Sequence, residues 1–310
     1  MTEYAGILEK VTPLQRYIAE EIATDHADGL LSRREALRRL ALLGVSASAA
    51  TTLIAACAKG DNSSPPAGSG TPTSAADAPG MEHAVPTTAI TWAGPSGQLQ
   101  GAWAAAADPR GGVLVIHENK GLNDWVRSVA GRLAGAGYSA LAIDLLSEEG
   151  GTATFADPAQ ATAALGKAPP ERFIADLRSG LDELDRRVPG KKTAVIGFCF
   201  GGGLTWQLLA AGEPRIDAAV PFYGPAPDQP DFDGSKQAAV LGFYGELDAR
   251  VDATRPAAQM ALQRAGMVHE LIVEPGADHA FFNDTGPRYN PAAASDAWRR
   301  LQDWFGAHLV

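Results

Sequence analysis

The chain has 310 residues, of which 45% are hydrophobic and 20% are charged, so it is long enough for one large domain or two small ones with a substantial core. Its formal net charge of −10 disfavours non-specific binding to nucleic acid, and no basic nucleic-acid motif is present. The chain has only two cysteines, Cys57 and Cys199, and no Cys/His cluster with zinc-ligand spacing, which argues against a disulfide scaffold and against a metalloenzyme.

The first 57 residues have the pattern of an export signal. Residues 32–40 are basic and contain the pair Arg33-Arg34, and residues 40–56 form an uncharged run of mostly small residues. This run is short and weakly apolar beside the roughly 20 strongly apolar residues of a membrane-spanning helix, and it is typical of a signal peptide. The paired arginines resemble a twin-arginine signal, which implies the export machinery as a partner.

Residues 53–57, Leu-Ile-Ala-Ala-Cys, resemble a bacterial lipoprotein box, so Cys57 is the expected lipidated first residue of the mature protein. These features predict a periplasmic or cell-surface protein that is tethered to the membrane. The lead before Arg33 is long for such a signal, and residues 14–40 are also typical of an amphipathic helix with a role of its own, such as binding. The alternative is a cytoplasmic protein with an uncleaved N-terminal helix.

Residues 58–85 are rich in Pro, Gly, Ser, Ala and Thr and hold hardly any large apolar residue. A segment of this composition cannot bury enough surface to fold, so we expect a disordered linker here.

Strand-like and helix-like segments alternate from residue 86 to 310, which predicts an α/β domain. Apolar or alternating runs predict strands over 89–94, 99–107, 111–118, 139–146, 192–198, 216–224, 237–248 and 268–276. Helical spacing predicts helices over 123–138, 169–190, 202–212, 252–266 and 290–309. The alternation favours a mostly parallel central sheet with helices on both faces.

The strand expected at 192–198 runs into a glycine-rich turn that contains Cys199. Gly197-Phe198-Cys199-Phe200-Gly201 has the G-x-S-x-G spacing of a nucleophile elbow, with Cys in place of Ser. The glycines permit a tight turn and a close crossing of helix and strand. The N–H of Phe200 would lie at a helix N-terminus, which suits an oxyanion and also favours a thiolate at Cys199. The alternative is a buried structural cysteine.

A hydrolase with such an elbow needs an acid and a histidine later in the chain. His279, which follows the strand expected at 268–276, is the candidate base. Asp248, which ends the strand expected at 237–248, is the candidate acid, with Glu246 and Asp252 as alternatives. Asp248 would orient the imidazole, and His279 would carry the proton between thiol, leaving group and water.

Four motifs within residues 86–310 together resemble the dienelactone hydrolase (carboxymethylenebutenolidase) family of α/β-hydrolases: HENKGLND, GFCFGG, GELD and DHAFFND. The resemblance implies the α/β-hydrolase fold and carboxylic ester hydrolysis. In the family, a glutamate after the early strand pairs with the resting thiol and helps to generate the thiolate, and the next residue supplies the second oxyanion N–H. The matching residues are Glu118 and Asn119.

The chain departs from the family where the best-known members hold the substrate carboxylate with two arginines. The matching positions contain Glu148 and Asn283, so dienelactone itself is not the expected substrate. Arg250, Arg288 and Lys120 are candidate replacement cations.

Together, the residues and the resemblance predict a thiol-dependent hydrolase that cleaves a small-molecule ester or lactone through a thioester acyl-enzyme, without a metal or organic cofactor. Aromatic side chains are candidates for an apolar pocket: Trp103, Trp125, Phe198, Phe200, Tyr223 and Phe282. The alternatives are a peptidase or acyltransferase on the same fold, and a noncatalytic tethered binding lipoprotein.

Overall fold

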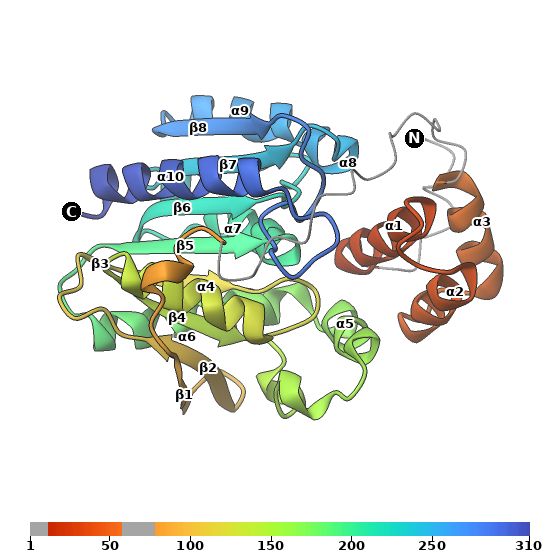
Figure 1. Cartoon of the computed structure of the whole chain (residues 1–310), viewed down its shortest axis with the longest axis horizontal. Helices are drawn as coiled ribbons and strands as arrows, with labels where there is room; N and C mark the ends of the chain where they lie inside the picture. Colours follow the sequence, from red (N-terminus) through yellow and green to blue (C-terminus); the bar gives the residue numbers. More distant parts are fainter. Residues whose placement is uncertain (1–11, 58–77) are drawn as a thin grey trace.

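The computed structural model describes residues 12–57 and 78–310, and an eight-stranded sheet forms its centre (Figure 1). The strands are β1 (Thr88–Ala93), β2 (Gln98–Ala104), β3 (Gly111–Ile116), β4 (Tyr138–Asp144), β5 (Thr193–Phe198), β6 (Ile216–Phe222), β7 (Ala239–Gly245) and β8 (His269–Glu274). Their order is β1-β2-β4-β3-β5-β6-β7-β8. Strand β2 pairs antiparallel with β1 and β4, and every other neighbouring pair is parallel. The predicted α/β architecture is confirmed.

Helices cover both faces of this sheet, with α4 and α10 on one side and α6 and α7 on the other (Figure 1). The helices of this part are α4 (Asp124–Gly135), α5 (Pro158–Lys167), α6 (Pro170–Arg187), α7 (Phe200–Ala210), α8 (Ala249–Asp252), α9 (Arg255–Arg264) and α10 (Pro291–His308). Short 3-10 helices are η2 (Met81–His83), η3 (Ser147–Glu149), η4 (Thr152–Thr154) and η5 (Asp233–Ser235). Helix α5 lies in a stretch for which the sequence predicts no element.

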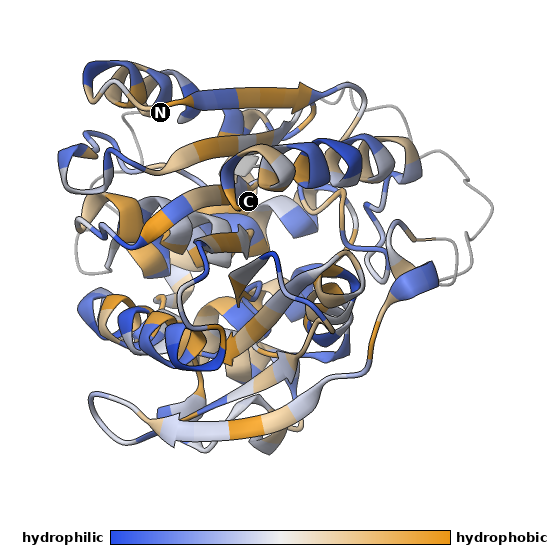
Figure 2. Ribbon diagram, turned by 90° about the vertical axis from the view of Figure 1, so that its left-hand side faces the viewer, coloured by the Kyte–Doolittle hydropathy of each residue, from blue (hydrophilic) through white to orange (hydrophobic). Residues whose placement is uncertain are grey.

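The central strands are buried on both faces, which explains their continuous apolar runs. Every residue of β3, β4 and β7 is buried, whereas the edge strand β1 alternates between exposed and half-buried residues. Figure 2 shows the same division, with hydrophobic colour in the inner strands and hydrophilic colour on the outer helices.

Three further helices, α1 (Pro13–Ala27), α2 (Arg33–Leu42) and α3 (Ala47–Cys57), form a separate group beside α5 and α8 (Figure 1). The amphipathic segment expected over 14–40 is therefore two helices. They separate at Gly29, whose φ is +76°, and Ser32 then caps the start of α2 by accepting a hydrogen bond from the Glu35 N–H. Among the described residues, no helix is long and apolar enough to span a membrane.

The segment expected to be a linker divides into two parts. Residues 58–77 lie outside the described residues. Residues 78–85 pack against the α/β domain, since the Val85 N–H donates to the Gly131 carbonyl of α4 and Ala78 is only 2% exposed. A Cβ on Gly80 would lie 2.5 Å from the Trp298 ring. Residues 78–85 are therefore ordered and pack on the α/β domain, and the expectation of a disordered linker is wrong for this part, because its small residues permit close packing.

Candidate active site

Cys199 sits in a strained turn between β5 and α7. Its backbone has φ 55° and ψ −114°, a region that residues with a side chain rarely adopt. A Cβ on Gly197 would lie 2.0 Å from the Gly201 carbonyl oxygen, and a Cβ on Gly201 would lie 2.4 Å from the Ile116 carbonyl oxygen. Glycine is thus required on both sides of the cysteine, as the sequence predicts, and the turn has the geometry of a nucleophile elbow.

His279 and Asp248 lie beside this turn as a buried pair. The His279 Nδ1 atom is 2.5 Å from Asp248 Oδ2, and both side chains are 6% exposed. The other oxygen of Asp248 accepts a hydrogen bond of 3.2 Å from the Val251 N–H, which fixes the carboxylate. The alternative acids are engaged elsewhere: Glu246 accepts from the Gly276 N–H, and Asp252 pairs with Arg255.

Each residue of the His279–Asp248 pair favours the charged form of the other. Burial opposes a charge on His279, but Asp248 and the Cys199 sulfur outweigh it, so the pKa of His279 lies well above its usual value. Burial would also raise the pKa of Asp248, but His279 outweighs it and holds that pKa below its usual value. The second imidazole nitrogen, Nε2, is buried, and a ring nitrogen of His279 lies within 4.8 Å of the Cys199 sulfur. The structure thus brings Cys199, Asp248 and His279 together.

Glu118 is buried close to this group but does not pair with the thiol. One carboxylate oxygen accepts from Asn283 Nδ2 at 2.9 Å, and the other accepts from the Tyr223 hydroxyl at 3.4 Å. Burial raises the pKa of Glu118. The thiol contact implied by the family resemblance is absent from the described hydrogen bonds of Glu118, whose two carboxylate oxygens bond to Asn283 and Tyr223 instead.

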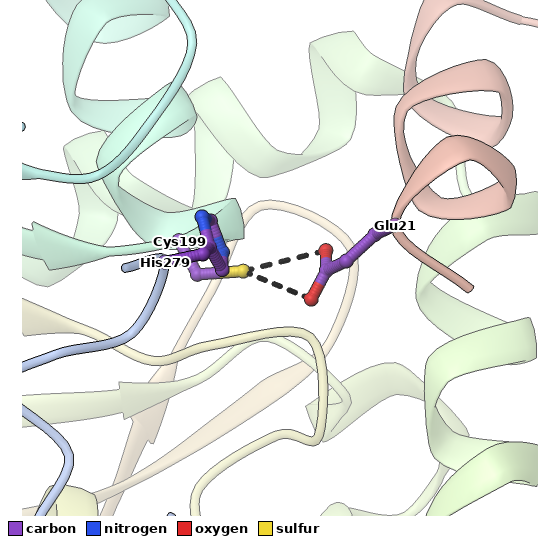
Figure 3. Close-up of side chains that lie close together, drawn as sticks. All are labelled: Glu21, Cys199 and His279. Atoms are coloured by element: carbon purple, nitrogen blue, oxygen red, sulfur yellow. Dashed lines mark hydrogen bonds between the residues drawn. The ribbon is translucent and has the colours of Figure 1, made fainter. Parts of the chain in front are cut away.

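The partners of the Cys199 sulfur come from α1. The Tyr17 hydroxyl lies 3.3 Å from the sulfur, and both carboxylate oxygens of Glu21 lie 3.5 Å from it. Figure 3 shows Glu21 facing the sulfur, with His279 beside the cysteine. Burial and the negative charge of Glu21 raise the pKa of the thiol, against the lowering effect of His279. The sequence predicts a favoured thiolate, whereas burial and the adjacent carboxylate raise the pKa of the thiol in the chain with α1 in place.

A cavity of about 200 Å³ lies between α1, the loop after β3 and the loop after β8. Cys199, His279 and Glu118 line it, together with Asn119 and Asn283. Asn119 is held from two sides: its carbonyl accepts from the Thr162 hydroxyl at 2.9 Å, and its side chain donates to Glu21 at 2.9 Å.

The candidate cations also lie near this cavity. Lys120 and Arg288 line it, and the guanidinium of Arg250 lies 4.7 Å above the Tyr17 ring. Glu148 does not line it, because this side chain pairs with Arg172 of α6 at 3.5 Å. The expected place of Glu148 in the substrate pocket is therefore wrong.

Most of the aromatic pocket candidates belong to the core. Phe198 is fully buried and stacks on Phe282 with ring centres 5.7 Å apart, so neither lines the cavity. Tyr223 contacts the site through its hydroxyl and lies edge-on to His279, with ring centres 5.3 Å apart. The other three are engaged away from the cavity: Trp125 donates to Asp284, Trp103 lies under Arg187, and Phe200 packs on Phe173.

Glu21, Cys199 and His279 also offer a set of metal-ligand atoms, all within 4.8 Å of one another. Thiolate, imidazole and carboxylate are donors that Zn²⁺ prefers. A metal bound there would occupy the sulfur and Nε2 atoms that a hydrolase uses as nucleophile and base, so the two uses are exclusive.

Sequence reasoning missed Tyr17 and Glu21 as residues of the site. The only signal is the amphipathic spacing of residues 14–40, which indicates a helix with a buried face but not what that face covers.

The sequence and fold are similar to those of known proteins. The sequence matches the model of the dienelactone hydrolase family over residues 99–309. An Escherichia coli O157:H7 protein named "Putative carboxymethylenebutenolidase" is 36% identical over 205 residues, which cover 62% of this chain and 75% of that protein. A solved dienelactone hydrolase-like promiscuous phosphotriesterase from metagenomic libraries is 28% identical, with a TM-score of 0.62 over 73% of this chain and 100% of that one.

The solved dienelactone hydrolase of Anabaena variabilis shares the fold, with a TM-score of 0.57 at 21% identity over 72% of this chain and 98% of that one. The family match spans more than half of the sequence and includes the elbow, the acid and the histidine. The chain therefore belongs to the dienelactone hydrolase family.

Proposed function

We propose that this protein is a thiol-dependent hydrolase of small esters or lactones, in which Cys199, Asp248 and His279 form the catalytic triad. The observation that carries the proposal is the cysteine at a positive-φ elbow beside a buried His–Asp pair. Structural cysteines do not need a strained backbone, whereas a nucleophile has to be presented in this way above the ends of the strands. Family membership supports ester or lactone chemistry.

The reaction begins with proton transfer from Cys199 to His279, whose other nitrogen is held by Asp248. The sulfur forms a bond to the substrate carbonyl carbon, and the carbonyl oxygen becomes an oxyanion. Collapse of this intermediate breaks the bond to the alcohol oxygen, which takes the proton from His279 and leaves a thioester. Water then loses a proton to His279 as it attacks the thioester, and Cys199 departs and regains its proton.

Two backbone N–H groups stabilise the oxyanion in this scheme. Phe200 is the first residue of α7, where N–H groups have no partner within the helix. Asn119 supplies the second, and the bond from Thr162 to its carbonyl holds that peptide in place. Glu118 would pair with the thiol once the sulfur is free of α1, as the family resemblance implies.

Burst kinetics with p-nitrophenyl acetate test the proposal on residues 78–310. The metagenomic relative is matched over its whole length by 73% of this chain, so we expect residues 78–310 to fold without α1–α3, and circular dichroism of this fragment checks it. We expect a burst of about one equivalent of p-nitrophenol, which the Cys199→Ala and His279→Ala variants lack. Arg299→Ala, on the exposed side of α10, is the control and keeps the burst. Release that persists in Cys199→Ala would reject the proposed nucleophile.

We also propose that the chain is exported and tethered through Cys57. Two features support it: Arg33 and Arg34 are exposed at the start of α2, and Cys57 is the last residue of α3. The paired arginines are thus accessible to the export machinery even in the folded chain. Mass spectrometry of membrane fractions should find a diacylglyceryl group on an N-terminal Cys57. Full-length protein with an intact Met1, found only in the cytoplasm, would support the cytoplasmic alternative instead.

A further inference from the structure

We propose that α1 is a built-in inhibitory segment that blocks Cys199 in the full chain and has to leave before a substrate can react. The inference rests on Cys199 being the nucleophile, as proposed above, and adds a control over when it acts. Residues 12–57 lie outside the part that matches the family model, so their position over the site is a property of this chain's own N-terminal segment.

The side chains of α1 occupy the space that a substrate carbonyl needs. Attack requires a carbonyl carbon at about 3–3.5 Å from the sulfur. In the structure, the Tyr17 oxygen lies 3.3 Å and the Glu21 oxygens lie 3.5 Å from that sulfur (Figure 3). Glu21 also accepts a hydrogen bond from the side chain of Asn119, the residue proposed to help bind the oxyanion. A substrate and α1 therefore exclude each other.

The helix is anchored by ion pairs at a distance from the sulfur. Arg288, in the loop after β8, donates to Asp25 at 2.8 Å and to Asp28 at 2.6 Å. Arg38 of α2 donates to Asp157, the N-cap residue of α5, at 2.7 Å. These contacts join the N-terminal group to the catalytic part on two sides of the cavity.

Apolar packing fixes the same helix on α5. Ile18 is fully buried, and Ile22 is 4% exposed. Gly166 of α5 leaves the space for this contact, since a Cβ there would lie 3.3 Å from Ile18 Cδ1 and 2.6 Å from Leu43 Cδ2. This apolar contact and the ion pairs together hold α1 on the α/β domain.

The helix also disfavours the reactive form of the nucleophile. The titratable and charged groups that face Cys199 are Tyr17 and Glu21 of α1, Glu118, Tyr223, Arg250 and His279. After burial, Glu21 is the largest cause of the raised pKa of the thiol. When α1 leaves, the sulfur regains water and loses this negative neighbour, so its pKa falls and the fraction of thiolate near neutral pH rises.

The position of Cys57 would link removal of the inhibitory helix to export. A cut immediately before Cys57, as proposed above, removes all of α1 and α2 and all of α3 but its last residue. The leader would then keep the esterase inactive until export, and its removal would open the site.

The test uses the full chain with Cys57→Ser, so that Cys199 is its only thiol, and with a specific protease site inserted between residues 57 and 78. Iodoacetamide labelling of Cys199 and hydrolysis of p-nitrophenyl acetate are measured before and after cutting and dilution. We expect both rates to rise about 100-fold, as for a site that is open about 1% of the time in the intact chain. The pH midpoint of labelling should move to lower pH.

A synthetic peptide of residues 12–29, added to the cut protein, should restore protection, and the same peptide with Tyr17→Phe and Glu21→Gln should protect far less. In the uncut chain, Asp25→Asn combined with Asp28→Asn should raise labelling several-fold, because Arg288 loses both of its partners in the N-terminal group and keeps only Asp278. Arg34→Gln, an exposed change in α2, is the control and leaves labelling unchanged.

Equal labelling rates before and after cutting would overturn the inference. So would hydrolysis that falls after cutting, since α1 would then be part of the working site. Labelling that rises without Cys199-dependent hydrolysis would uphold the block and reject the proposed hydrolase function, so the two failures are distinguishable.

Discussion

Replacing Asp248 with Asn tests the part of the triad that geometry defines most closely. Asp248 Oδ2 lies 2.5 Å from His279 Nδ1, and Oδ1 accepts from the Val251 N–H. If the Asn oxygen keeps the bond to Val251, its NH₂ group faces His279 Nδ1 and forces the proton onto Nε2. That tautomer cannot accept the proton of Cys199, and the same change in a serine-protease triad lowers kcat by about 10⁴.

The opposite orientation of the amide only partly rescues activity. The Asn oxygen would then accept from His279, but the NH₂ group would face the Val251 N–H, so two buried donors would meet. Leaving them unpaired costs about 1–3 kcal/mol. We therefore expect kcat/KM for p-nitrophenyl acetate to fall between about 10-fold and 10⁴-fold in residues 78–310, which corresponds to about 1.4–5.4 kcal/mol.

The assay compares kcat/KM across pH, with circular dichroism to show that the variant is folded. Because Asp248 raises the pKa of His279, the Asp248→Asn change should lower that pKa. The midpoint of the pH profile that reports the titration of His279 should therefore move to lower pH. A folded Asp248→Asn variant with wild-type kcat/KM would refute this reasoning. Glu246 and Asp252 would then be the candidates for the triad acid.

Three further predictions concern the same domain. Asp284→Ala removes the carboxylate that lies 2.7 Å from the buried Arg132, and it should lower the free energy of unfolding in urea by about 3–5 kcal/mol. The control Asp303→Ala, which removes a side chain that is 72% exposed, should change it by no more than about 0.5 kcal/mol. Equal losses of stability in the two variants would disprove the role of burial. Burial raises the pKa of Glu274 to about 7, so its contribution to stability is lost as pH rises from about 4.5 through about 7, and Glu274→Gln should flatten the free energy of unfolding over that range. Glu118→Gln should lower kcat/KM without unfolding the domain, and unchanged activity would remove Glu118 from the account.

The elbow could be predicted from sequence because its requirements are local. Gly197 and Gly201 are needed where the chain crosses itself within a few residues, and the spacing around Cys199 records that need. The inner strands can be predicted equally well, since a strand buried on both faces is a continuous apolar run. Helix α5 was missed because its residues are mainly Ala, Gly, Gln and Thr, with few large apolar residues to set a period.

The environment of the thiol could not be predicted because it depends on contacts across most of the chain. Nothing in the composition of α1 shows that Tyr17 and Glu21 meet a sulfur at position 199. The directions of two side chains could not be predicted for the same reason. Phe198 has the right sequence position for the pocket but points into the core, and Glu148 pairs with Arg172. Sequence patterns predict helices, strands and local turns, whereas tertiary packing decides which neighbours a side chain contacts.

The most direct test of the central claim is to identify the residue that carries the acyl group. Residues 78–310 are mixed with p-nitrophenyl acetate, quenched in acid during the burst and digested for mass spectrometry. We expect one acetyl group on the peptide that contains Cys199, and none in protein labelled beforehand with iodoacetamide. An acetyl group on another residue, or release of p-nitrophenol while Cys199 stays unmodified throughout the burst, would contradict it.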